Sequence, residues 1–201
     1  MVFVMNLDPN VDMISVLIHT SSLLFFVFDP FASIPIFITL TKDLDKNERK
    51  KSANRAVMVA GILFILFVLF GNALLSFFGI SLASFKIAGG LVLLLMSLEI
   101  VLGINMTGSQ GEVGWVVIAT PILTGPGVIT TAIVLTSKYG CATILLSGAI
   151  ALLLTWILLR RAEFLIQLVG KTVIDIFSKV IGLLIGALGV EFVMDGIVEF
   201  L

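Results

Sequence analysis

Six long apolar runs determine what this chain can fold into. They cover residues 13–41, 56–78, 82–104, 113–137, 142–159 and 176–198. A helix needs about 20 apolar residues to cross the hydrocarbon core of a bilayer, and every run reaches or approaches that length. The strands of a membrane β-barrel would instead give short segments of alternating polarity. The runs therefore predict an all-α, polytopic membrane protein with six transmembrane helices.

The composition excludes several other classes of protein. Charged residues make up 12% of the chain, against about 25% in a typical soluble domain, and mean hydropathy is +1.22. These values exclude a soluble globular domain and a disordered chain, and no basic face is large enough to bind nucleic acid. The single cysteine, Cys141, cannot build a disulfide framework, a multi-thiolate metal site or an iron–sulfur centre. We expect no cofactor and no metal site.

The basic residues predict the orientation in the membrane. Ten of the 12 Lys and Arg residues lie in segments 42–55 and 160–179. With six spans both segments fall on one side, which the positive-inside rule assigns to the cytoplasm. Both termini are then extracytoplasmic, and the first run, which no basic residue precedes, is expected to be a retained span. Asp45 and Glu48 resemble a capping box that opens a helix, and 161–176 is expected to be an interfacial amphipathic helix.

The chain carries an internal duplication. Pro30 and Pro35 in the first run recur as Pro121 and Pro126 in the fourth, at an offset of 91 residues. Further matches at that offset or at 93 residues are Ser33 with Thr124, Ile38 with Ile129, Thr39 with Thr130, Lys86 with Lys179, Gly89 with Gly182 and Gly103 with Gly196. The identities are few, so chance similarity is the alternative.

The duplication predicts two three-helix repeats, 1–104 and 113–201, within one membrane domain. Three is an odd number, so the second repeat enters the membrane from the opposite side. Inverted repeats of this kind are typical of secondary transporters, whose substrate sites lie near the bilayer midplane at broken helices.

The paired prolines predict that the first and fourth spans are broken. Each proline removes a backbone donor and clashes with a preceding carbonyl. Pro35 and Pro126 suit the first turn of a new helix, so we expect the second half-helix of each span to begin there. Ser33 and Thr124 lie just upstream, where a hydroxyl can cap free N–H groups.

Two such breaks predict a shielded polar cavity, because freed backbone groups in lipid need partners. A half-helix N-terminus attracts a carboxylate, and a half-helix C-terminus, near Phe28–Asp29 or Ala119–Thr120, presents carbonyls to an ammonium group or Na⁺. A small zwitterion fits between such ends. The predicted substrate site comprises Asp29, Pro30, Ser33, Pro35, Thr120, Pro121, Thr124, Gly125, Pro126, Gly127 and Thr130.

Asp29 is the strongest single candidate, because a carboxyl group deep in an apolar span is costly. It can bind the substrate ammonium, bind a coupling cation or carry a proton; alternatively it caps the helix after the break or pairs locally. The other coupling candidates are Glu99, Glu191 and His19. The two glutamates can instead reach an interface, and the histidine can instead form a hydrogen bond within the bundle.

Glycines cluster in the third and sixth runs, at Gly89 and Gly90 and at Gly182, Gly186 and Gly189. They indicate close helix packing, with flexibility for a rocking motion as the alternative.

Three separated motifs resemble those of a known family: Asp29-Pro30 with Ile34–Phe37 and Leu40–Lys42, Phe78–Ser81 with Ile87–Gly90, and Pro121–Thr130. In order and spacing they are similar to the first-span, third-span and fourth-span motifs of the MarC family. The resemblance implies an inner-membrane protein of six spans, in contact with membrane lipids. It also implies transport of glycine, alanine and similar small neutral amino acids, coupled to a proton or sodium gradient. Family members often carry Gly-Asn where this chain has Ala32-Ser33, so here a hydroxyl replaces an amide.

An enzyme is not expected. Intramembrane metalloproteases need a pair of histidines in an H-E-x-x-H motif, and His19 is the only histidine. No serine lies in a G-x-S-x-G context. The residues leave two alternatives to a transporter open. One is a channel, because half-helices also build pores. The second is a membrane scaffold or sensor that transports nothing.

Overall fold

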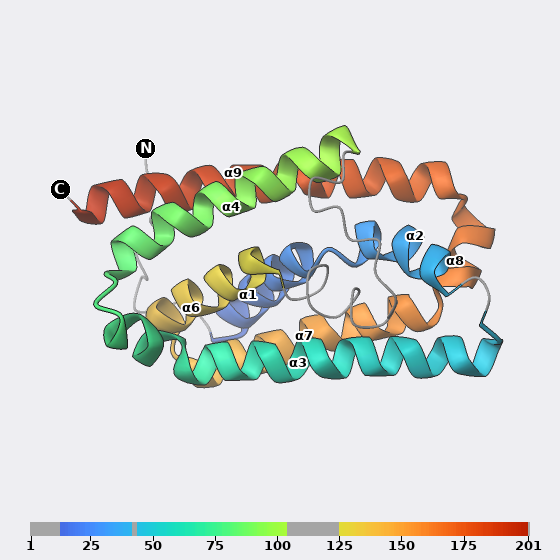
Figure 1. Cartoon of the computed structure of the whole chain (residues 1–201), viewed down its shortest axis with the longest axis horizontal. Coiled ribbons are helices and arrows are strands. Elements are labelled where there is room, and N and C mark those ends of the chain that lie inside the picture. Colours follow the sequence, from blue (N-terminus) through green and yellow to red (C-terminus); the bar gives the residue numbers. More distant parts are fainter. Residues whose placement is uncertain (1–12, 42–43, 104–124, 201) are drawn as a thin grey trace.

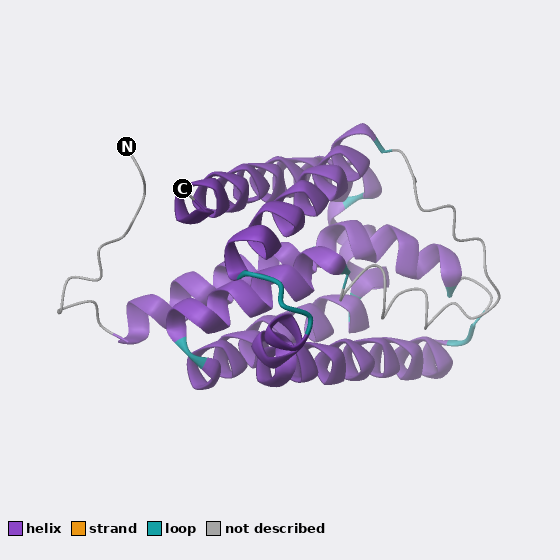
Figure 2. Cartoon of the chain, turned by 60° about the vertical axis from the view of Figure 1, so that its left-hand side comes forward, coloured by secondary structure: helices purple, strands orange, loops and turns teal. Residues whose placement is uncertain are grey.

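The computed structural model describes residues 13–41, 44–103 and 125–200. Every regular element in these ranges is a helix (Figure 2). The helices are α1 (Met13–Phe28), α2 (Pro30–Leu40), α3 (Lys46–Phe77), α4 (Leu82–Leu102), α6 (Pro126–Tyr139), α7 (Cys141–Arg160), α8 (Ala162–Val169) and α9 (Lys171–Phe200). The four longest helices, α3, α4, α7 and α9, run along the long axis of the molecule, with α1 and α2 between them in the view of Figure 1.

Five stretches of the described chain are long and apolar enough to span a membrane. They are Met13–Ile38, Lys46–Phe77, Leu82–Leu102, Cys141–Arg160 and Lys171–Phe200. This confirms the predicted all-α, polytopic membrane class. The fourth predicted span, 113–137, is described only from residue 125 onward, where it forms the 14 residues of α6.

The outer surfaces of the long helices are apolar. Phe70, Leu91 and Leu183 are each more than half exposed. Water-soluble monomers rarely expose apolar surface on this scale, whereas lipid tails solvate it. The faces turned toward neighbouring helices carry small residues such as Ala56 and Ala60, which are fully buried.

Helix α3 is longer than the hydrocarbon core. Its 32 residues span about 48 Å at the α-helical rise, so its basic first turns extend beyond a core about 30 Å thick. The predicted helix start is confirmed, because Asp45 is the N-cap of α3 and its Oδ1 accepts a hydrogen bond of 2.7 Å from the Glu48 amide.

The predicted amphipathic segment 161–176 is shorter in the structure. Helix α8 ends at Val169, because Gly170 adopts a φ of 86°, a left-handed value that glycine adopts at little cost. The chain then turns directly into α9 at Lys171.

Helices α4 and α9 pack against each other closely along their length. A Cβ on Gly90 would lie 2.5 Å from the Gly189 carbonyl oxygen, and a Cβ on Gly189 would lie 2.7 Å from the Gly90 carbonyl oxygen. A Cβ on Gly186 would lie 2.6 Å from Ser97 Oγ. The prediction of close packing at these glycines is therefore confirmed, since only a residue without a side chain fits.

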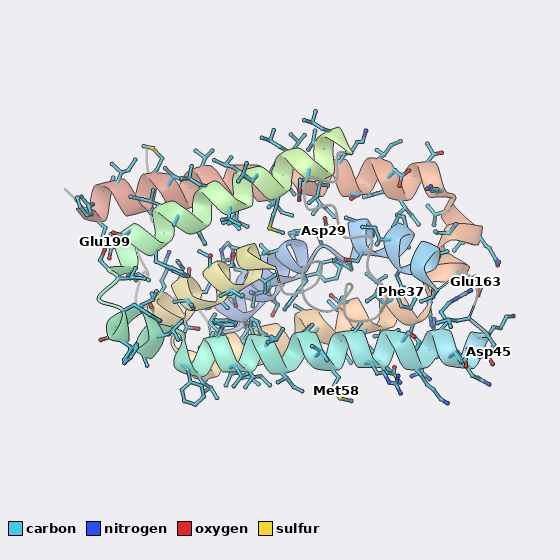
Figure 3. All side chains as sticks on the ribbon, viewed as in Figure 1. Asp29, Phe37, Asp45, Met58, Glu163 and Glu199 are labelled. Carbon is cyan, nitrogen blue, oxygen red and sulfur yellow. The ribbon has the colours of Figure 1, made fainter. Side chains whose placement is uncertain are left out.

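The two ends of the molecule carry different ion pairs. At one end, Arg49 Nη1 lies 2.9 Å from Glu163 Oε2, and its Nε and Nη2 donate to the Thr41 carbonyl at 3.3 and 3.1 Å. This contact fastens the end of α2 to α3 and α8. At the other end, Lys86 Nζ lies 2.6 Å from Glu199 Oε2. Glu163 and Glu199 mark these opposite ends in Figure 3.

Candidate functional site

The first span is broken at Asp29. This residue has φ 41° and ψ 66°, and it is the only described residue other than glycine with a positive φ. The left-handed conformation costs a side-chain-bearing residue free energy. Asp29 compensates by acting as the N-cap of α2, because its Oδ1 accepts a hydrogen bond of 3.1 Å from the Ala32 amide. Pro30 occupies the first helical position, where its missing N–H costs nothing.

The prediction that the second half-helix begins at Pro35 is wrong. Pro35 lies inside α2, one and a half turns after its start. Ser33 does not cap a helix end either: its hydroxyl donates to the Asp29 carbonyl oxygen at 2.8 Å. The aspartate outcompetes the serine as a cap, because Asp29 immediately precedes a proline and its carboxylate reaches the free amides of α2.

The fourth span begins its described half-helix where the sequence predicts. Pro126 is the first residue of α6, and Gly125 is its N-cap in an extended conformation (φ −64°, ψ 174°). Among the described residues, no side chain caps this N-terminus. The predicted site residues Thr120, Pro121 and Thr124 lie outside the described residues.

The two breaks lie at the same level of the molecule. In Figure 1 the junction of α1 with α2 and the start of α6 both lie midway along the long axis. The last turn of α1 and the first turns of α6 also share one buried cluster, through Val27 and Phe28 on one side and Val128 and Ala132 on the other. The carbonyl end of α1 therefore lies near the amide end of α6.

The Asp29 side chain is buried in the middle of the bundle. It is 4% exposed, and Figure 3 places it between the end marked by Asp45 and the end marked by Glu199. Its Oδ1 caps α2, but its Oδ2 is buried and has no hydrogen-bond partner among the described residues. A buried polar atom without a partner is costly. Asp29 therefore does cap the helix after the break, which was the alternative to a binding role. The cap uses only Oδ1 and leaves Oδ2 without a partner among the described residues.

Helix α4 forms a wall beside the start of α6. A Cβ on Gly127 would lie 2.6 Å from Leu93 Cδ2 and 2.8 Å from Met96 Sδ. One helical turn further along, a Cβ on Gly89 would overlap the Thr130 side chain, which is itself buried. Both glycines bring the backbones of α4 and α6 close together.

Sequence reasoning missed Leu93, Met96 and Thr131 as neighbours of this site. The Thr131 hydroxyl donates to the Gly127 carbonyl at 2.8 Å and is fully buried. In the sequence, only the position of Thr131 next to the predicted site residue Thr130 could have indicated it. Nothing distinguishes Leu93 and Met96 from the other apolar residues of their span.

The coupling candidates lie at different distances from Asp29. Glu99 follows Met96 by one turn and is half-buried, so it lies on the part of α4 near the start of α6. His19 is exposed on α1, about 15 Å from Asp29 by helical rise. The structure thus brings Glu99 toward the breaks and leaves His19 outside them.

Glu191 also lies away from the breaks. It is exposed on α9. Helix α9 contacts α2 nearer its own N-terminus, where Phe177 stacks on Phe31 with ring centroids 6.2 Å apart. The helical rise from Phe177 to Glu191 is roughly 20 Å.

The comparisons with known proteins agree on one family. The family model described as MarC family integral membrane protein matches residues 14–201. A UPF0056 membrane protein of Methanocaldococcus jannaschii is 35% identical over 190 residues, covering 88% of this chain and 93% of the relative. A UPF0056 membrane protein of Escherichia coli strain K12 is 30% identical over 189 residues, covering 87% and 88%. No solved structure matches.

Proposed function

The chain belongs to the MarC family of integral membrane proteins, and we propose that it is a secondary active transporter of small neutral amino acids such as glycine and alanine. The observation that carries this proposal is the buried carboxylate at a helix break. One oxygen of Asp29 holds the start of α2, and the other has no partner among the described residues.

The chemistry of the two breaks suits a zwitterion. The Oδ2 of Asp29, which has no partner among the described residues, and the carbonyls of Val27 and Phe28 at the end of α1, for which the helix offers no donors, attract an ammonium group. The first amides of α6, at Gly127 and Val128, have no acceptor within their helix and attract a carboxylate. Both groups of one α-amino acid are thereby bound by opposite helix ends.

The surroundings of the breaks restrict the size of the substrate. Phe28 is fully buried next to Asp29 in sequence. It shares a buried cluster with Val128 and Ala132 of α6, and Gly127 is flanked by side chains of α4. We expect these side chains to leave room only for a small substrate side chain. This favours glycine and alanine over larger amino acids.

The course of the helices supports six spans in two inverted repeats. Counterparts in the two halves run in opposite directions along the long axis: α1–α2 against α6, α3 against α7, and α4 against α9 (Figure 1). In such folds one repeat rocks against the other around a fixed central site, which gives alternating access. The glycine-lined contact of α4 with α9 joins the two repeats.

The coupling ion in this proposal is a proton or Na⁺ at Asp29, with Glu99 as the second candidate. Basic residues at the start of α3 and the end of α7 gather at one end of the molecule, where Arg49 contacts α8. We assign that end to the cytoplasm of the inner membrane, which places both chain termini outside.

Uptake into liposomes tests this function. The purified full chain, reconstituted in liposomes, is expected to take up labelled glycine and alanine saturably under an inward proton or sodium gradient. Preloading with unlabelled alanine should accelerate entry of the label, because a transporter exchanges substrate and a channel does not. Protein-free liposomes and labelled tryptophan, which is too large for the site, serve as controls. Flux that rises linearly with concentration and shows no exchange would identify a channel, and no flux of either amino acid would refute transport.

A further inference from the structure

A basic groove lies at the end of the molecule that carries the Arg49 ion pair. Its volume is about 320 Å³, and its walls come from the start of α3, the end of α7 and α8. Its basic side chains are Lys46, Arg49, Lys50, Arg160 and Arg161, and its one acidic side chain is Glu163. The groove is separate from the helix breaks and has no part in the proposed transport chemistry.

Most of the positive charge in the groove is uncompensated. Arg49 pairs with Glu163 at 2.9 Å. Within the described ranges, the structure shows no ion pair for the other four basic residues of the groove, Lys46, Lys50, Arg160 and Arg161. Four cations around one small groove repel one another and attract an anion.

One of these cations is already held in place. The guanidinium of Arg160 lies 5.0 Å from the centroid of the Trp156 ring, and Trp156 Nε1 donates to Asn54 Oδ1 at 2.7 Å. A stacked guanidinium presents its donors in a fixed plane, which matches the geometry of a phosphate. Tryptophan is also typical of the membrane–water interface.

An apolar surface borders the groove on α8. Phe164, which lines the groove, is 57% exposed, and Leu168, one turn further along, is 67% exposed. These two side chains share a face of the helix, while Leu165 and Ile166 pack inward on the buried cluster around Ala162. A basic groove beside an exposed apolar helix face matches a ligand with an anionic head and a hydrocarbon tail.

We propose that this groove binds the phosphodiester headgroup of an anionic phospholipid, with an acyl chain along Phe164 and Leu168. The lipid then lies beside the Arg49 contacts that fasten the end of α2. The groove thus couples the lipid composition of the cytoplasmic leaflet to the stability of that helix end.

Lipid titration of the purified full chain in a neutral detergent tests this site. Binding of phosphatidylglycerol is followed by native mass spectrometry and by thermal stabilisation, with phosphatidylcholine, glycerol phosphate and inorganic phosphate as the other arms. We expect saturable binding of phosphatidylglycerol at low stoichiometry, and at least tenfold weaker binding in the other three arms. Binding of phosphatidylcholine as strong as that of phosphatidylglycerol would overturn the proposal. Equally strong binding of inorganic phosphate would also overturn it, because the groove would then be a site for a soluble anion.

Two double variants of equal charge separate the groove from general surface attraction. Each basic residue near an anionic headgroup is worth about fivefold in affinity, so Lys50→Gln with Arg161→Gln should weaken phosphatidylglycerol binding by about 30-fold. Lys51→Gln with Arg55→Gln removes two exposed charges of the same helix end that do not line the groove, and it should leave binding within about twofold. Equal losses in both variants would overturn the proposal. If the first variant does not fold, Lys50→Gln alone provides the same comparison against Lys51→Gln, with an expected loss of about fivefold.

Discussion

Asp29→Asn is expected to reduce alanine uptake at least about 100-fold, because loss of one partner from a buried charge pair costs about 3–5 kcal/mol. The variant removes the negative charge that binds the substrate ammonium or the coupling ion. It should leave the fold intact, since asparagine is as good an N-cap as aspartate and tolerates a left-handed conformation. Uptake and counterflow in liposomes measure the first effect, and thermal unfolding in detergent measures the second.

Asp45→Asn is the matched control for this variant. Asp45 is also an N-cap whose Oδ1 accepts an amide hydrogen bond from the residue three positions later, but it is exposed at one end of the molecule. We expect its substitution to change neither uptake nor stability. Normal uptake by Asp29→Asn, or equal losses in the two variants, would remove Asp29 from the site.

Gly189→Ala is expected to destabilise the protein by about 1–3 kcal/mol, the usual cost of overpacking a tight contact. The added Cβ would lie 2.7 Å from the Gly90 carbonyl oxygen and 3.0 Å from the Leu94 amide nitrogen. These are backbone atoms, so no rotamer change relieves the clash and α4 must move away from α9. Thermal unfolding in detergent should show a clear decrease in midpoint, and uptake should fall with it if the two helices move relative to each other during transport.

Gly61→Ala provides the matched control. Gly61 also lies within a long helix, but among the described residues a Cβ there would meet only Leu152 Cδ1, at an ordinary contact distance of 3.5 Å. Alanine has the higher helix propensity, so we expect unchanged or slightly raised stability. A decrease as large as that of Gly189→Ala would mean that the α4–α9 contact is not especially tight.

The broken first span shows what local signals can and cannot predict. Asp29, Pro30 and Pro35 indicated a break, and a break is present. Its position was predicted wrongly, because two proline positions met the same rule for a helix start and the sequence does not rank them. In the fourth span Pro126 follows Gly125, no other start competes in the described part, and the prediction is confirmed.

The sequence does not predict which residues contact the candidate glycines and charged residues, because those contacts depend on tertiary structure. The sequence indicated close packing at Gly89, but only the fold shows that its neighbour is Thr130. Hydropathy likewise identified Glu191 as a charge within an apolar run, but it does not give the rotation of the helix about its own axis. That rotation leaves Glu191 exposed.

The position of bound alanine relative to Asp29 is the most direct test of a substrate site at the helix break. Solid-state NMR of the full chain in bilayers, with ¹⁵N-alanine and ¹³C-aspartate, reports contact between the ammonium nitrogen and a side-chain carboxylate. A charge-assisted hydrogen bond of about 2.7–2.9 Å predicts strong dipolar coupling to one carboxyl carbon, which disappears in Asp29→Asn. Bound alanine without coupling to any aspartate carboxyl, or with coupling that persists in Asp29→Asn, would contradict a substrate site at this break.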